Sequence, residues 1–213
     1  MSRPRRFSEV TGFVLAGGAS QRMGIDKARL PWGSESMVER QIRLLRAICR
    51  SVAIIGPPDR FPDAGIQVYE DEIPGRGPLG GVHTGLRRAR TEFSLFLSCD
   101  MPLMEAGFLR YLCQQALASR ASATLPPPWA KEVYPLCAVL RRRVLSTVRS
   151  SLSLGQNQVG RFFKKVQRRT ISKAEFRRAG FFPRIFYNAN TPEEYEKVRR
   201  QFEALHHQSL GGE

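Results

Sequence analysis

The segment from Leu15 to Lys27, Leu-Ala-Gly-Gly-Ala-Ser-Gln-Arg-Met-Gly-Ile-Asp-Lys, combines residue types that can hold a phosphate group. Gly17 and Gly18 let backbone N–H groups approach a ligand closely, because no Cβ stands in the way. Arg22 and Lys27 add fixed positive charge beside these amides. The segment matches neither G-x-x-x-x-G-K-[ST] nor G-x-G-x-x-G, which argues against a Walker-type ATPase and a dinucleotide-dependent dehydrogenase. A plain glycine turn with two solvated cations is the alternative interpretation.

Two aspartates stand just beyond apolar runs, where a buried strand would end. Asp100 follows the run Phe93–Ser98 in the sequence Cys-Asp-Met-Pro, and Asp71 lies in Tyr-Glu-Asp-Glu. A carboxylate and substrate phosphates together suit Mg²⁺, so we predict Asp100 as a metal ligand. Asp71 is placed to accept hydrogen bonds from a ribose or a base edge. The alternatives are an aspartate that turns the chain before Pro102 and an acidic, solvated loop at 69–72.

Two further segments offer groups that a nucleotide could contact. The glycines of Gly-Pro-Leu-Gly-Gly at 77–81, Gly80 among them, either bring the backbone against a flat base or form a turn before a helix. Asn188 and Asn190 precede Thr-Pro-Glu-Glu at 191–194, which has the capping-box pattern of a helix start. The capping box explains the threonine and the glutamate but not the two asparagines, which we predict to face a ligand.

The elements that must position these residues alternate along the chain. Short apolar runs predict strands at 10–16, 51–55, 66–69, 93–98, 121–125 and 134–140, and helical spacing predicts helices at 36–48, 82–89, 105–119 and 142–152. This alternation predicts a Rossmann-like, doubly wound α/β fold with a mostly parallel sheet. Ligands of such sheets bind at the carboxyl ends of the strands, where the candidate residues above are expected.

Length and composition indicate one globular domain spanning residues 1–213, with 42% hydrophobic and 25% charged residues. No apolar run is long enough to cross a membrane and no signal peptide is recognisable, so we expect a cytoplasmic protein. The four cysteines are widely spaced, which argues against a disulfide framework and a structural zinc site. The formal net charge is +15, and residues 141–184 hold 13 basic side chains against one acidic side chain, Glu175. Such a segment predicts an anionic partner, which could be a phosphate-rich small molecule, a nucleic acid or an acidic protein surface.

Four of these motifs, in order, resemble the molybdenum cofactor guanylyltransferase family. They are the loop at 15–27, Gly-Pro-Leu-Gly-Gly at 77–81, Cys-Asp-Met-Pro at 99–102 and Asn-x-Asn-Thr-Pro-Glu-Glu at 188–194. The loop is the most specific of them, because sugar and isoprenoid nucleotidyltransferases of similar fold usually carry a sequence nearer Ala-Ala-Gly-x-Gly-x-Arg.

The resemblance implies an enzyme that joins GMP from GTP to the terminal phosphate of molybdopterin and releases pyrophosphate. It implies nucleotide contacts at Leu15, Ala16, Gly17, Lys27, Asp71 and Asp100, with Asp100 also at the magnesium position. An asparagine that the family often has at the end of the second strand aligns with Ile55 or Gly56 here, so this contact is missing. The expected partners are GTP, molybdopterin and a recipient molybdoenzyme or its chaperone, without a membrane, and nucleic acid is kept only as a remote alternative.

The expected reaction is an attack by a pterin phosphate oxygen on the α-phosphorus of GTP. Arg22 and Lys27 would stabilise charge on the departing pyrophosphate, and we predict both, with Asp100, as catalytic residues. We expect part of the basic segment 141–184 to form the acceptor half of the cleft.

Two other functions stay open at this point. A related transferase could use CTP or a sugar-phosphate acceptor. Alternatively, the basic segment, whose charges interleave with phenylalanines, could hold nucleic acid, although neither an RNP motif nor a helix-turn-helix signature is present.

Overall fold

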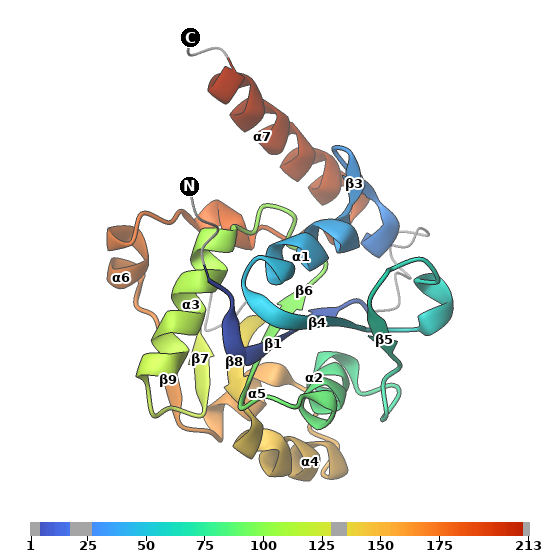
Figure 1. Cartoon of the computed structure of the whole chain (residues 1–213), viewed down its shortest axis with the longest axis vertical. Helices are drawn as coiled ribbons and strands as arrows, with labels where there is room; N and C mark the ends of the chain where they lie inside the picture. Colours follow the sequence, from blue (N-terminus) through green and yellow to red (C-terminus); the bar gives the residue numbers. More distant parts are fainter. Residues whose placement is uncertain (1–4, 18–26, 129–135, 211–213) are drawn as a thin grey trace.

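The central feature of the molecule is a seven-stranded sheet with helices on both faces (Figure 1). The computed structural model describes residues 5–17, 27–128 and 136–210, with side chains described as far as residue 200 and at Phe202. The strand order is β5-β4-β1-β6-β8-β7-β9. The strands are β1 (Phe7–Leu15), β4 (Cys49–Ile55), β5 (Gln67–Tyr69), β6 (Phe93–Ser98), β7 (Ala123–Leu125), β8 (Cys137–Arg141) and β9 (Arg168–Thr170).

The register brings the carboxyl ends of four parallel strands to one edge. Leu15, the last residue of β1, pairs with Ile55 of β4 on one side and with Ser98 of β6 on the other. Ile55 in turn pairs with Tyr69 of β5. β8 runs antiparallel to β6 and β7, and β9 is parallel to β7. The predicted mostly parallel α/β sheet is therefore confirmed.

Each face of the sheet has its own hydrophobic core. Along β1 the residues alternate, so Val10 and Val14 pack with one cluster, whereas Phe13 and Leu15 pack with the other. The first cluster includes residues of α1 (Met37–Arg46), α3 (Ala106–Ala118) and α6 (Lys173–Arg178). The second cluster includes residues of α2 (Gly77–Arg88), α4 (Leu145–Ser153) and α5 (Val159–Lys164).

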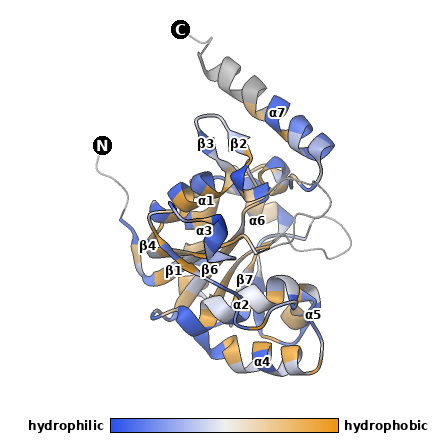
Figure 2. Ribbon diagram, turned by 90° about the vertical axis from the view of Figure 1, so that its right-hand side faces the viewer, coloured by the Kyte–Doolittle hydropathy of each residue, from blue (hydrophilic) through white to orange (hydrophobic). Residues whose placement is uncertain are grey.

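A third, smaller cluster lies off the sheet and attaches the last helix, α7 (Pro192–Leu210), to the body. Its centre is Trp32, in the small hairpin of β2 (Pro31–Trp32) and β3 (Glu35–Ser36), whose ring meets the Tyr195 ring edge-on with 6.1 Å between centroids. The Tyr195 hydroxyl also donates a hydrogen bond to the Pro31 carbonyl. Beyond this contact α7 projects away from the sheet (Figures 1 and 2).

Each predicted strand and helix is present with shifted bounds, but the sequence did not predict β2, β3, α5, β9 or α6. Three of the predicted segments differ in detail. Residues 77–81, for which a turn before a helix was one expectation, form the first turn of α2, with Pro78 at a position where a helix needs no N–H donor. The helix expected at 142–152 begins as a 3₁₀ turn over 142–144 before α4. The strand expected at 134–140 is observed as β8 from Cys137, and residues 134 and 135 lie outside the described part. No described helix is long and apolar enough to cross a membrane.

Candidate active site

A cleft of about 510 Å³ opens at the carboxyl edge of the sheet. Its floor is the end of β1 with the two residues that follow it, and the ends of β4 and β6 flank it. The first turn of α2, Leu136 before β8 and Asn190 before α7 also contribute to the described walls. Of the residues predicted from the sequence, those that line it are Leu15, Ala16, Gly17, Lys27, Asp71, Asp100 and Asn190.

Backbone hydrogen bonds continue past the strand ends and fix the floor of the cleft. The Ala16 amide donates to the Ile55 carbonyl at 2.9 Å, and the Cys99 amide donates to the Leu15 carbonyl at 3.1 Å. The Gly56 amide donates to the Tyr69 carbonyl at 2.9 Å. These bonds hold the start of the glycine loop between the neighbouring strands.

Lys27 and Asn190 meet in the cleft although they come from opposite ends of the chain. The Lys27 ammonium donates a hydrogen bond to the Asn190 side-chain oxygen at 3.3 Å. Asn190 is itself held by α7, because its backbone amide donates to the Glu194 carboxylate at 2.8 Å. Asn188, by contrast, is exposed and is not among the residues that line the cleft.

Asp100 is a partly buried carboxylate, and one of its two oxygens makes no hydrogen bond within the described part of the chain. Burial raises its pKa, whereas a hydrogen bond from Ser98 and the positive charge of Lys27 lower it. Its Oδ1 atom is buried and has no hydrogen-bond partner in the described part of the chain. No group of three or more histidine, cysteine, aspartate or glutamate side chains that could hold a metal occurs among the described residues. Asp100 therefore fits a cation that takes most of its other ligands from a substrate and from water.

Asp71 lies against glycines on two sides. Burial, followed by the charge of Glu70, raises its pKa, and its Oδ1 atom has no hydrogen-bond partner among the described residues. A Cβ at Gly17 would lie 3.4 Å from one carboxylate oxygen of Asp71, and a Cβ at Gly81 would lie 3.5 Å from the other. Because these positions carry no side chain, there is room beside the carboxylate, which lines the cleft. Gly80 is buried beside it rather than lining the cleft.

Comparison with known proteins identifies the family. A model of the MobA-like NTP transferase domain matches residues 12–173. The chain belongs to this family. It is 32% identical to the molybdenum cofactor guanylyltransferase of Syntrophotalea carbinolica, over 88% of this chain and 90% of that protein. It is 30% identical to the probable molybdenum cofactor guanylyltransferase of Carboxydothermus hydrogenoformans, over 91% and 96% of the two chains.

Solved structures show that this MobA-like transferase shares its fold with other nucleotidyltransferases. The molybdopterin-guanine dinucleotide biosynthesis protein A of Archaeoglobus fulgidus superposes with a TM-score of 0.78 at 16% identity, covering 91% of this chain and 99% of its own. A CMP-2-keto-3-deoxy-manno-octonic acid synthetase complexed with CTP superposes with a TM-score of 0.68 at 12% identity, covering 92% and 99%. The resemblance that the four motifs indicated is confirmed.

One feature of the MobA-like cleft was not foreseen from the sequence. Gly56 packs so closely behind the glycine loop that a Cβ there would lie 3.1 Å from the carbonyl carbon and oxygen of Ala16. An asparagine at position 56 would therefore require the backbone at Ala16 to shift by a few tenths of an ångström. Ile55 lines the cleft with apolar surface instead.

The remaining predicted residues divide into two groups. Gly18 and Arg22 fall in the stretch 18–26, outside the described residues. The basic segment 141–184 contributes no residue to the described lining of the cleft. Some of its charges have structural partners, since Arg141 pairs with Glu92 at 2.9 Å and Lys165 donates to the Ser151 hydroxyl at 3.2 Å. The structure therefore gives no support to the expectation that this segment forms the acceptor half of the cleft.

Proposed function

We propose that the protein transfers GMP from GTP to the phosphate of molybdopterin, with release of pyrophosphate. The observation that carries the proposal is the meeting of Lys27, Asp71 and Asp100 in one cleft at the end of the glycine loop. A cation, an acceptor for a sugar or base, and a metal-binding carboxylate are the groups that nucleotidyl transfer requires. The names and coverage of the relatives support the choice of guanylyl transfer among such reactions.

In the proposed reaction a phosphate oxygen of molybdopterin forms a bond to the α-phosphorus of GTP. The bond from that phosphorus to the bridging oxygen breaks, and the pyrophosphate leaves with the electron pair. Lys27 stabilises the charge that grows on the leaving group, with Arg22 and the amides of Gly17 and Gly18 as further donors. The attacking phosphate is already ionised, so no side chain has to act as a general base.

Asp100 is the residue that we propose to hold Mg²⁺. Its buried Oδ1 atom has no partner among the described residues, and a hard carboxylate oxygen is a preferred ligand of this ion. When bound, Mg²⁺ would neutralise the charge of the triphosphate. The positive charge of Lys27 keeps Asp100 more readily ionised than its burial alone would allow. Asp71 would accept hydrogen bonds from the ribose or the guanine edge.

The proposal extends to the organisation of the chain and to its partners. We propose that residues 1–213 act as a single nucleotidyltransferase domain, because the described strands β1 to β9, apart from the β2–β3 hairpin, belong to one sheet. Action in the cytoplasm and delivery of the product to a recipient molybdoenzyme or its chaperone stay predictions.

The test is direct. Purified protein is incubated with molybdopterin, Mg²⁺ and GTP, CTP or ATP in turn, and pyrophosphate release and the mass of the pterin product are measured. We expect pyrophosphate and a guanine dinucleotide product with GTP and much less product with the other nucleotides. Preferential use of CTP, or transfer to a sugar phosphate in place of molybdopterin, would contradict the proposed function and indicate a related nucleotidyltransferase instead. Tight, salt-sensitive binding of duplex DNA without any transfer would indicate a nucleic-acid-binding protein.

A further inference from the structure

The loop that follows Asp100 is buried, irregular and held by side chains of α1. Met101, Leu103 and Met104 are each at most 6% exposed, yet residues 101–104 belong neither to β6 nor to α3. A buried loop of this kind needs donors for its carbonyl groups, because regular secondary structure does not supply them.

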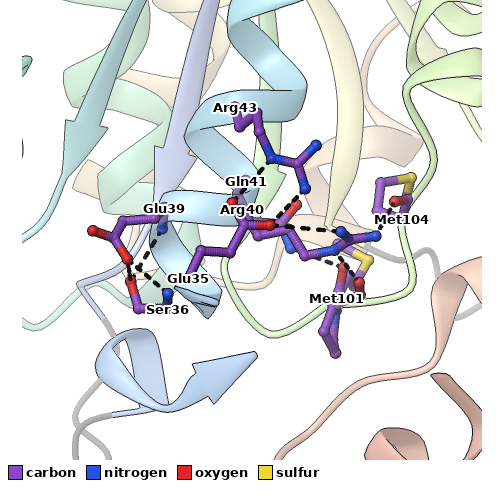
Figure 3. A network of polar contacts seen from close by, with 9 residues as sticks. Glu35, Ser36, Glu39, Arg40, Gln41, Arg43, Met101 and Met104 are labelled. Atoms are coloured by element: carbon purple, nitrogen blue, oxygen red, sulfur yellow. Dashed lines mark hydrogen bonds and ion pairs between the residues drawn. The ribbon is translucent and has the colours of Figure 1, made fainter. Parts of the chain in front are cut away.

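Gln41 and Arg40, neighbours on α1, supply several of these donors (Figure 3). The Gln41 amide nitrogen donates to the Met101 carbonyl at 2.9 Å, and Gln41 is fully buried. The Arg40 guanidinium donates to the Pro102 carbonyl at 2.5 Å and to the Met104 carbonyl at 3.5 Å. Met101 directly follows Asp100, so the Gln41 bond holds the peptide between Met101 and Pro102, one peptide beyond the proposed metal ligand.

The same arginine connects the loop to the segment that carries Lys27. Arg40 lies 3.7 Å from the Glu35 carboxylate of the β2–β3 hairpin, and its side chain is only 14% exposed. That hairpin follows Lys27 closely in the chain. On the far side of the loop, the Ala189 amide donates to the Asp100 carbonyl at 2.9 Å, next to Asn190. The loop after Asp100 is thus fixed from α1 and from the segment before α7.

We propose that Arg40 and Gln41 are positioning residues, which hold the loop 101–104 so that Asp100 presents its carboxylate to the metal-bound triphosphate. This inference rests on the proposed function, because it concerns the residue that we assign as the Mg²⁺ ligand. Neither side chain is among those that line the cleft, so their effect on the reaction passes through Asp100.

Arg43 provides a matched control for Arg40. It lies on the same helix and binds the same glutamate, at 2.5 Å, but its side chain is 58% exposed. Among the contacts of the described residues, Arg43 donates to Glu35 and not to the loop 101–104. Replacing either arginine by Met removes a guanidinium that pairs with Glu35, and only the Arg40 change also removes donors from the loop.

The experiment uses the full chain with Arg40→Met, Gln41→Met, Arg40→Lys and the control Arg43→Met. Calorimetry measures the affinity for GTP with and without Mg²⁺, and steady-state kinetics give kcat and KM. We expect Arg40→Met and Gln41→Met to lose most of the gain in affinity that Mg²⁺ brings and to lower kcat by about tenfold or more. Their metal-free GTP affinity should stay within about twofold of wild type. Arg40→Lys should recover part of the loss, and Arg43→Met should behave as wild type.

A double-mutant cycle with Asp100→Asn completes the test. If Arg40 acts through Asp100, adding Arg40→Met to Asp100→Asn changes Mg²⁺-dependent GTP binding no further. Equal losses of GTP affinity with and without Mg²⁺ would overturn the positioning role. So would losses of Mg²⁺-dependent affinity that simply add in the double variant. Should Arg40→Met fail to melt cooperatively, Gln41→Met and Arg40→Lys decide the question by the same measurements.

Failure of the proposed function gives a different pattern. If wild-type protein binds Mg²⁺ and GTP but transfers nothing to molybdopterin, the proposed acceptor is wrong. The calorimetric comparison of the variants then still tests the positioning role of Arg40 and Gln41. If Asp100→Asn keeps the full Mg²⁺ effect, Asp100 is not the metal ligand, and the positioning role proposed for Arg40 and Gln41 is overturned with it.

Discussion

The Lys27 ammonium and the Asn190 side-chain oxygen lie 3.3 Å apart across the cleft, although 163 positions separate them in the chain. This contact joins the end of the glycine loop to the segment that begins α7. It restrains a long, flexible lysine in the place where a phosphate group is expected.

Asn190→Ala should therefore raise KM for GTP, by about three- to tenfold, because Lys27 loses the hydrogen bond that holds it in the cleft. Steady-state kinetics with varied GTP measure the effect. Asn188→Ala is the matched control, since Asn188 belongs to the same short segment but is exposed and outside the described lining. Similar effects of the two substitutions would show that the whole segment matters rather than the contact with Lys27.

Lys27→Ala should weaken binding of GTP far more than binding of GMP. The ammonium is expected beside the β- and γ-phosphates, which GMP lacks, so the loss should reach about tenfold or more for GTP only. Calorimetry with both nucleotides measures the difference. Lys27 lies in a short 3₁₀ helix (Lys27–Arg29), and Arg29→Ala, at an exposed position of the same helix, is the control. Equal losses for GTP and GMP would place Lys27 near the α-phosphate or the nucleoside instead.

Asp100→Asn should leave a folded protein that still binds some GTP but loses Mg²⁺-dependent transfer. Because burial raises the pKa of Asp100, ionising it in the folded state is unfavourable, and this cost is greatest above its pKa. The substitution should therefore raise the melting temperature at neutral pH when no nucleotide is present, and raise it less in acid. Asp63→Asn, at an exposed position, is the control. Wild-type turnover of Asp100→Asn would contradict the metal assignment.

Gly56→Ala should destabilise the protein by about 1–3 kcal/mol, because the added methyl group meets backbone atoms of Ala16 that have little room to move. The same displacement should weaken GTP binding. Thermal melting and calorimetry measure the two effects. Gly160→Ala serves as the comparison, since a Cβ there contacts nothing within 4 Å and the position is helical. That substitution should stabilise the protein slightly.

The environment of Glu175 should make the stability of the protein depend on pH in acid. Hydrogen bonds from Arg169 and Ser172 lower the pKa of Glu175 from 4.5 to about 2. The pKa of Glu175 is lower in the folded state than in the unfolded state. Its ionised carboxylate therefore stabilises the fold at pH values above 4.5, and this stabilisation is lost as the pH falls towards about 2. The side chains of Arg169 and Glu175 are both partly exposed, so we expect their ion pair to contribute less than about 1 kcal/mol to the free energy of unfolding. Urea unfolding across this pH range should show that the free energy of unfolding falls less steeply with decreasing pH in Glu175→Gln than in wild type.

The sequence predicted the parallel part of the fold well because buried parallel strands have a distinctive pattern. Continuous apolar runs such as 93–98 end abruptly at polar or glycine residues, and the residues that follow must gather at one edge. This reasoning alone brings the glycine loop, Asp71 and Asp100 together, and the structure has the described part of that loop, Leu15 to Gly17, in one cleft with both aspartates. The first turn of α2 was harder to predict, because glycines at 77–81 suit a turn as well as a helix that packs closely against a sheet.

Contacts between distant segments could not be read from local patterns. Asn188 and Asn190 look equivalent in the sequence, and only the path of the chain into α7 decides which of them faces Lys27. Arg40 and Gln41 read as polar positions of an amphipathic helix. Nothing local indicates that a loop about 60 residues further along places its carbonyl groups against them.

The attachment of α7 through Trp32 and Tyr195 sets an order on the assembly of the enzyme during synthesis. All strands of the large sheet have been made once β9 is complete at Thr170, whereas Asn190 and the helix that holds it emerge from the ribosome afterwards. A nascent chain can therefore form its sheet while the wall beside Lys27 is still missing. We therefore expect the cleft to reach its full affinity for a nucleotide only once the last helix has docked on the hairpin.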